Sequence, residues 1–113
     1  MKVPNAEYEV VDIRKLTDYC LSHEHSRGKH KARVFLSALG MTGSNAQELA
    51  GTLLQKVITE DCAIGTVDEF GTRYIVDFTY ATGTKEAMVR STWIIKLGEK
   101  RPRLTSCYVL RGR

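Results

Sequence analysis

The sequence predicts an α+β domain in which N-terminal helices pack on a four-stranded antiparallel β-meander. Apolar residues recur with the helical period of 3.6 over residues 12–59. Over residues 62–110 the period becomes two, and β-branched and aromatic residues replace the helix formers. Helices first and strands afterwards favour a layer of helices on one face of a sheet. A length of 113 residues suits one domain, so we expect residues 1–113 to form a single unit.

Three helices are expected in the first half. The segment "DIRKLTDYCLS" places apolar residues on one helical face, and "KHKARVFLSALG" does the same before stopping at Gly40. Glycine is a common residue just past a helix end. The third segment, "TGSNAQELAGTLLQKVIT", begins with residues that cap helices well.

The second half predicts four strands, at about Ala63 to Glu69, Thr72 to Ala81, Lys85 to Lys96 and Arg103 to Leu110. A two-residue loop at Thr82-Gly83 would pair Ala81 with Thr84. Side chains alternate along a strand, so this register predicts two faces. The first carries Tyr74, Val76, Phe78, Ala87, Val89, Ser91 and Trp93; the second carries Arg73, Asp77, Arg90 and Thr92. A slip of one residue would exchange them.

The net charge of +4 is modest, but the basic residues are clustered. One group lies between Arg27 and Arg33, and the other comprises Lys96, Lys100, Arg101, Arg103, Arg111 and Arg113. Such clusters favour a polyanion such as nucleic acid, although a solvated surface explains them equally well.

The three cysteines, Cys20, Cys62 and Cys107, are odd in number and form no C-x-x-C pair, so a reducing cytoplasm is expected. The sequence has no apolar run of the roughly 20 residues that a membrane helix needs, and no membrane association is expected.

Metal and cofactor sites are not expected. Cys20, His23, His25 and His30 form a C-x2-H-x-H-x4-H string of zinc-type ligands, but its spacing matches no common zinc pattern. We expect Cys20 in the core, and His23 and His25 as exposed loop residues. The sequence also has no P-loop, no G-x-G-x-x-G, no H-E-x-x-H and no carboxylate cluster for magnesium.

The segment "GKHK" is the first candidate site. Lys29, His30 and Lys31 would occupy the first turn of the second helix, where free backbone N–H groups and the macrodipole favour an anion. Cations there are unfavourable unless an anion binds. The two lysines disfavour a positive charge on the His30 imidazole, which leaves it able to accept a proton. A solvated helix surface is the alternative.

The strands supply the other candidates. No nucleophile elbow surrounds Ser91, so we expect its hydroxyl to bind a phosphate oxygen. Trp93 would position the substrate, although core packing is the commoner role of a tryptophan. The residues expected to bind substrate are Arg27, Arg33, Arg73, Arg90, Thr92, Arg103 and Tyr108.

Two resemblances add to this picture. The segments "RGKHKARVF", "FGTRYIVDF", "VRSTWII" and "RPRLTSCYVL" resemble a family of small bacterial proteins catalogued as a domain of unknown function, found alone and at the ends of toxin-like proteins. The Lys/His cluster and S-x-W are similar to metal-independent ribonucleases, the group of barnase, colicin D and RelE. This second resemblance implies a site of Lys29 or Lys31, His30, Ser91 and Trp93. The colicin D type, however, separates its lysine and histidine by two residues.

The function expected from the sequence is therefore a metal-independent endoribonuclease of toxin type. It would cleave RNA, with tRNA as one candidate substrate, by attack of a ribose 2′-OH on the adjacent phosphate. An antitoxin or immunity protein is a possible second partner. The alternative is a non-catalytic module that binds nucleic acid or protein through the same basic surface.

Overall fold

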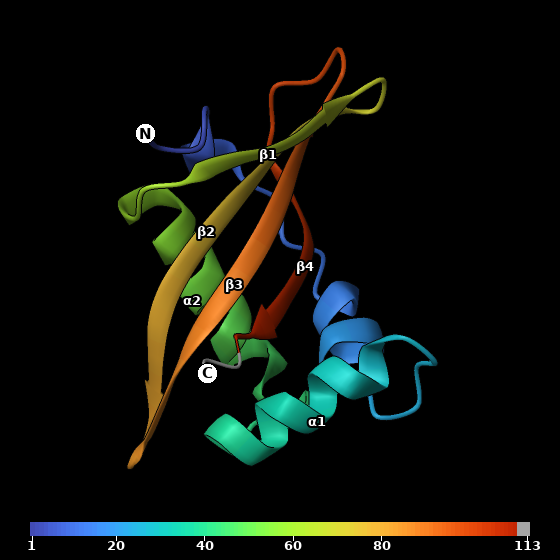
Figure 1. The fold of residues 1–113 in the computed structure, drawn as a ribbon, viewed down its shortest axis with the longest axis vertical. Helices are drawn as coiled ribbons and strands as arrows, with labels where there is room; N and C mark the ends of the chain where they lie inside the picture. The colour runs from blue at the N-terminus through green and yellow to red at the C-terminus, as the bar shows by residue number, and fades with distance from the viewer. Residues whose placement is uncertain (111–113) are drawn as a thin grey trace.

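The computed structural model describes residues 1–110, so Arg111 and Arg113 of the C-terminal basic group lie outside the described residues. Figure 1 shows one antiparallel sheet with helices on one face and along one edge. The elements are η1 (Ala6–Tyr8), η2 (Leu16–Cys20), α1 (Gly28–Leu39), η3 (Gly43–Asn45), α2 (Ala46–Thr59), β1 (Ala63–Asp68), β2 (Gly71–Thr82), β3 (Lys85–Lys96) and β4 (Arg103–Val109). The α+β prediction is confirmed.

The strands follow one another in the order β1-β2-β3-β4, as expected of a meander. Thr82 pairs with Lys85, so the β2–β3 turn lies one residue later than predicted, with Gly83 at a positive φ of 58°. Tyr74 consequently faces Trp93 rather than Ser91. Because this register differs from the predicted one by two residues, and the side-chain period is also two, both predicted faces are confirmed.

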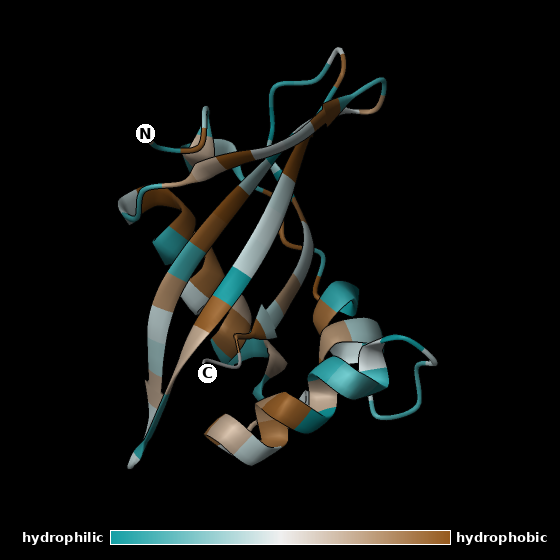
Figure 2. Cartoon of the chain, viewed as in Figure 1, coloured by the Kyte–Doolittle hydropathy of each residue, from teal (hydrophilic) through white to brown (hydrophobic). Residues whose placement is uncertain are grey.

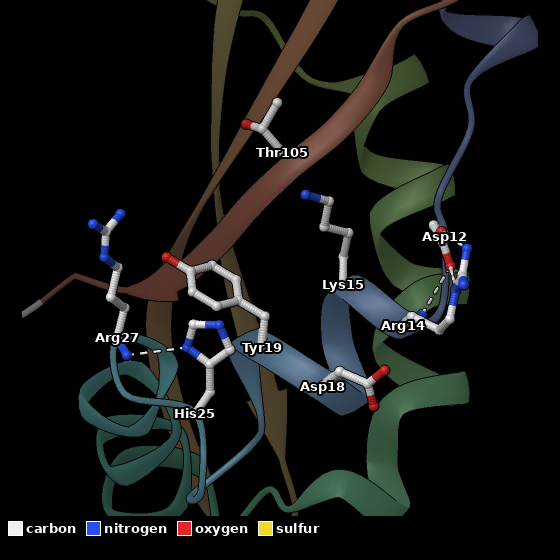
Figure 3. Close-up of a pocket in the computed structure, with 8 residues that line it drawn as sticks. All are labelled: Asp12, Arg14, Lys15, Asp18, Tyr19, His25, Arg27 and Thr105. Carbon is white, nitrogen blue, oxygen red and sulfur yellow. Dashed lines mark hydrogen bonds and ion pairs between the residues drawn. The ribbon is translucent and has the colours of Figure 1, made fainter.

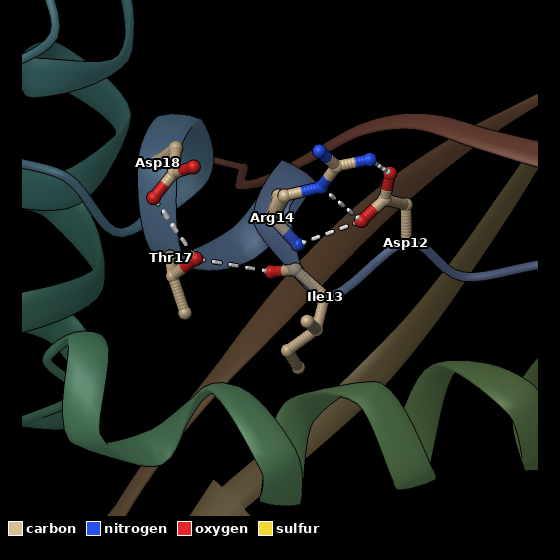
Figure 4. A network of polar contacts seen from close by, with 5 residues as sticks. All are labelled: Asp12, Ile13, Arg14, Thr17 and Asp18. Atoms are coloured by element: carbon tan, nitrogen blue, oxygen red, sulfur yellow. Dashed lines mark hydrogen bonds and ion pairs between the residues drawn. The ribbon is translucent and has the colours of Figure 1, made fainter.

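The first predicted helix is replaced by a single π-helical turn, η2. Asp12 fixes the start of this segment, because its Oδ1 accepts the Arg14 backbone N–H at 3.0 Å and its Oδ2 meets the Arg14 guanidinium at 2.8 Å. The Thr17 hydroxyl donates to the Ile13 carbonyl at 3.4 Å (Figure 4). Short π-helical turns are rare and occur frequently at functional sites.

The core lies between α1, α2 and the covered face of the sheet. Phe35 and Leu39 of α1 and Leu49, Leu53 and Val57 of α2 belong to one buried cluster with the inward side chains of β2 and β3. Figure 2 shows hydrophobic residues on both helices and along the strands. The largest fully buried side chains of the core include Phe35, Leu49, Leu53, Val57, Val76, Val89 and Trp93. Within residues 1–110, no helix has the length and apolar character needed to cross a membrane.

Candidate functional site

The structure corrects the predicted roles of Ser91 and Trp93. They are 1% and 0% exposed, and they lie on the helix-covered face of β3. The Ser91 hydroxyl donates to the Val76 carbonyl at 2.9 Å and accepts the Trp93 indole N–H at 3.0 Å. Both polar side chains therefore have their hydrogen-bond partners inside the core, as buried polar groups generally must. The prediction that these two side chains contact a substrate is wrong for this structure.

The first backbone N–H groups of α1, which were predicted to bind an anion, instead donate hydrogen bonds to His25. The backbone N–H groups of Arg27 and Gly28 both donate to His25 Nδ1 at 3.0 Å, and the Lys29 N–H donates to the His25 carbonyl at 2.9 Å. The imidazole thus plays the part that a serine or aspartate side chain usually plays at a helix start. These amides are not free for an anion, and His25 has a structural role that the sequence prediction did not give it.

Two N–H donors on Nδ1 determine the tautomer of His25. Nδ1 must offer its lone pair to them, so the ring proton of the neutral imidazole sits on Nε2. The ring packs edge-on against Tyr19, with 4.8 Å between the ring centres. His25 can therefore donate a hydrogen bond through Nε2, while its Nδ1 lone pair is already engaged by two backbone N–H groups.

Gly28, the first residue of α1, packs directly against the backbone of η2 at Tyr19. A Cβ placed there would lie 2.0 Å from the Tyr19 carbonyl oxygen, so the close approach of these two segments requires glycine. The approach brings the Tyr19 side chain next to Lys31 of α1. The sequence prediction did not include Tyr19 among the site residues.

Lys31 is the lysine of "GKHK" that reaches this site. Its Nζ donates to the Tyr19 hydroxyl at 2.9 Å and lies 4.8 Å and 5.6 Å from the ring centres of Tyr19 and Tyr108. A cation over aromatic faces is held by the ring quadrupoles. Within residues 1–110 Lys31 has no carboxylate partner, while Lys29 makes no side-chain hydrogen bond or ion pair there.

An open pocket of about 570 Å³ lies beside this pair, between η2, the start of α1 and β4 (Figure 3). Its walls are formed by Asp12, Arg14, Lys15, Asp18, Tyr19, His25, Arg27 and Thr105. Arg14 is neutralised by Asp12, whereas Lys15 and Arg27 are exposed and form no ion pair within the described part of the chain. The sequence prediction included Arg27 and missed Lys15 and Thr105.

The three arginines on the sheet are paired with carboxylates. Arg73 contacts Asp68 at 2.7 Å, Arg103 contacts Glu99 at 3.2 Å, and Arg90 makes two hydrogen bonds of 2.9 Å with Asp77. The Asp77 contact raises the pKa of Arg90 above its ordinary value. These three arginines were predicted to bind substrate, but their charges are already compensated within the fold.

The remaining predicted residues lie in three different places: inside the sheet, beside Lys31, and in a separate hollow on α1. The Thr92 hydroxyl lies 2.6 Å from that of Thr105 and donates to the Ser106 carbonyl at 3.3 Å, so its hydrogen bonds are made within the sheet. Tyr108 stands opposite Arg90 in the β3–β4 register and close to Lys31. His30 and Arg33 line a different hollow on α1, together with Val34 and Ser37.

Two buried thiols lie beneath the Lys31 site. The Cys107 backbone N–H donates to Cys20 Sγ at 3.3 Å, and the Ser106 hydroxyl lies 3.9 Å from the same sulfur. Hydrogen bonding from the Cys107 thiol, opposed by burial and assisted by the Cys107 N–H, Ser106 and Lys31, lowers the pKa of Cys20 to about 7. The same contact, together with burial, raises the pKa of Cys107. The expected core position of Cys20 is confirmed.

The described residues contain no group of three or more histidine, cysteine, aspartate or glutamate side chains placed to hold a metal ion. His23 and His25, which belong to the C-x2-H-x-H-x4-H string, line a second open hollow with Asp18 and Glu24.

Comparison with known proteins identifies the family. Residues 2–111 match the family described as "Domain of unknown function (DUF6883)". The chain belongs to this family. The resemblance to a family of unknown function is thereby confirmed, and it extends over nearly the whole chain.

A solved structure shares the fold of this DUF6883 domain. One chain of a "Contact-dependent growth inhibition toxin - immunity protein complex from Klebsiella pneumoniae 342" aligns with a TM-score of 0.64 and 18% identity, over 90% of this chain and 100% of that chain. No curated protein matches the sequence. At this identity the likeness establishes a shared fold.

Proposed function

We propose that this domain is a metal-independent endoribonuclease of toxin type, with its site at the junction of η2 and α1. The proposal is carried by three cations that make no ion pair within residues 1–110: Lys15 and Arg27 line the open pocket together with Tyr19, and Lys31 donates a hydrogen bond to the Tyr19 hydroxyl. Positive charges without carboxylate partners suit a phosphodiester substrate. The shared fold with a chain of a toxin–immunity protein complex supports the toxin assignment.

The reaction needs three contributions. The ribose 2′-OH attacks the adjacent phosphorus and loses its proton, the phosphorane gains negative charge, and the 5′-oxygen leaves with a proton. Tyr19 would donate that last proton, because Lys31 is hydrogen-bonded to its oxygen and stabilises the phenolate that forms. Arg27 and Lys15 would hold the phosphate, and His25 would donate a hydrogen bond to it through Nε2. The products are a 2′,3′-cyclic phosphate and a free 5′-OH.

His30 remains our candidate for the base that takes the 2′-OH proton. It is exposed on α1 and makes no side-chain hydrogen bond within residues 1–110, but it lines a hollow other than the pocket, so this role requires an RNA that reaches from the pocket onto α1. The Nδ1 of His25, by contrast, already accepts two backbone N–H groups. Ser91 and Trp93 have no part in this mechanism beyond supporting the sheet.

The test is to incubate the purified protein with total RNA in EDTA and to analyse the termini of the fragments. We expect discrete products ending in 2′,3′-cyclic phosphate, and a loss of about 10² to 10³ in rate for Lys31→Gln. Lys85→Gln, at the exposed β2–β3 turn, serves as the matched control and should retain full activity. Intact RNA after incubation with folded protein would contradict the proposal.

A second candidate function is a non-catalytic module that binds nucleic acid or protein through the same surface. One observation favours it: the imidazole in the pocket has no free proton-accepting nitrogen, which reduces the acid–base chemistry available there. This candidate predicts steeply salt-dependent RNA binding without any cleaved product.

An immunity protein is the partner we propose for the toxin-type function, because the similar structure is a toxin–immunity protein complex. Its surface would be acidic where it covers Lys15, Arg27 and Lys31, since opposite charges across an interface accelerate association and favour the correct partner.

A further inference from the structure

Two adjoining hollows lie along α1, on the C-terminal side of Arg27 in the candidate pocket. His30, Arg33, Val34 and Ser37 line the first hollow beyond the pocket. The next, of about 440 Å³, is lined by Val34, Ala38, Glu86, Ala87, Met88, Val109 and Leu110. The two share Val34, so they adjoin each other where α1 passes the start of β3.

We propose that the hollow between α1 and the start of β3 binds an unpaired guanine base of a single-stranded RNA whose phosphates lie along α1. The proposal rests on the proposed function, because it extends the same substrate from the pocket at Arg27. It names the class of RNA and the base that the domain recognises there.

The charges along α1 support this path for the RNA backbone. Arg27 and Arg33 are separated by about 9 Å along the helix axis at 1.5 Å per residue. Both are exposed, and neither forms an ion pair within residues 1–110. His30 lies between them on the same exposed side, lining the hollow with Arg33. These groups can therefore contact consecutive phosphates without first breaking an ion pair.

The walls of the hollow suit the flat faces of a base. Val34, Met88 and Leu110 provide apolar surface, and Met88 remains 42% exposed although it lies on a strand. A thioether sulfur makes favourable contacts with aromatic rings. RNA-binding proteins commonly read unstacked bases in single strands through such stacking contacts together with hydrogen bonds to the base edges.

Glu86 supplies the selectivity. It is the one charged side chain in this hollow, it is exposed, and it has no ion-pair partner within the described residues. A carboxylate only accepts hydrogen bonds. Guanine offers two adjacent donors, N1–H and the N2 amino group, to its two oxygens. Adenine and cytosine each offer one amino group, and the single N–H of uracil lies between two carbonyl acceptors that the carboxylate would repel.

The experiment measures the affinity of the protein for 2′-O-methyl pentanucleotides, which cannot be cleaved because they lack the attacking hydroxyl. The four sequences are UUGUU, UUAUU, UUCUU and UUUUU, at one fixed salt concentration. We expect UUGUU to bind about tenfold more tightly than the others, and Glu86→Gln to remove this preference. Glu69→Gln, which changes another exposed carboxylate at the β1–β2 turn, should retain it.

Equal affinities of the wild-type protein for the four sequences, or a guanine preference that survives in Glu86→Gln, would overturn the proposal, as would failure to bind all four. Guanine-selective binding without cleavage of natural RNA would retain the base site and refute the nuclease function. Cleavage of natural RNA without guanine selectivity would refute only the base site.

Discussion

Lys15 and Arg27, at the junction of η2 and α1, differ from the three arginines on the sheet in lacking a carboxylate partner within the described residues. Arg73, Arg90 and Arg103 on the strands each contact an aspartate or glutamate. Lys15 and Arg27 have no such partner within residues 1–110 and stand around an open pocket. Paired cations fix the fold locally, whereas unpaired cations create the positive potential that attracts a polyanion. For the proposed polyanion-binding surface, ion pairing is therefore a more informative criterion than the number of basic residues.

The two regions also differ in what their polar side chains do. Ser91 accepts the Trp93 indole N–H and donates to the Val76 carbonyl, so both side chains are satisfied inside the core. Tyr19 and Lys31 are only partly buried, and their mutual hydrogen bond lies close to a pocket lined by Tyr19. The following predictions test this division, beginning with the largest expected effect.

Trp93→Ala should lower the free energy of unfolding by about 3–5 kcal/mol, because it removes the largest fully buried side chain and leaves a cavity. Urea denaturation measures the loss. Phe70→Ala is the control, since Phe70 is 63% exposed and its removal should change stability by less than about 0.5 kcal/mol. A Trp93→Ala variant of unchanged stability would show that this residue is not part of the core.

His25→Ala should lower the free energy of unfolding by about 0.5–2 kcal/mol, because the first amides of α1 lose their hydrogen-bond acceptor. Thermal denaturation and amide exchange at Gly28 report the effect. His23→Ala is the matched control, since His23 is exposed and makes no hydrogen bond among the described residues. Equal stabilities for the two variants would contradict the capping role.

Arg27→Ala should weaken RNA binding and reduce the slope of log affinity against log salt by about 1, as expected when one phosphate contact is lost. Arg73→Ala should leave the slope unchanged, because the charge that it removes is already compensated by Asp68. Measuring the affinity of both variants for one oligonucleotide across a salt series shows whether only the unpaired cation contributes to the salt dependence of binding. Equal changes in slope would refute the distinction.

The smallest predicted effect is a pH dependence of stability from Cys20. The folded-state pKa of Cys20 is about 7, below the ordinary value of 9.0. Its contribution to the free energy of unfolding is therefore complete above pH 9 and is lost as the pH falls through 7. The raised pKa of Cys107 acts in the opposite direction only above pH 9. Stability should therefore rise from pH 7 to 9 in the wild type and less in Cys20→Ala. Cys62→Ala, the control, should keep the wild-type rise.

The fold could be predicted closely because it depends on periodicity, which the sequence displays directly. Even the register error left both faces of the sheet correct, since it amounted to two residues. The same alternation placed Ser91 in an apolar row, and that placement was a better guide to its role than the S-x-W resemblance was.

The site was only partly predictable. Arg27, Lys31 and Tyr108, which the structure brings to the candidate site, were among the residues expected there, because basic clusters and polar strand residues are visible in the sequence. Tyr19 looked like one more residue of an amphipathic helix. Its contact with Lys31 depends on how η2 packs against α1 at Gly28, which local periodicity does not specify.

The most direct test of the account is the single-turnover rate of RNA cleavage in EDTA for Tyr19→Phe and Ser91→Ala, each corrected for the folded fraction. Tyr19→Phe keeps the ring but removes the hydroxyl bonded to Lys31, so we expect a loss of about 10² to 10⁴ in rate. Ser91→Ala should lose stability and keep the wild-type rate per folded molecule. A folded Ser91→Ala protein that no longer cleaves RNA, beside a fully active Tyr19→Phe protein, would contradict the account.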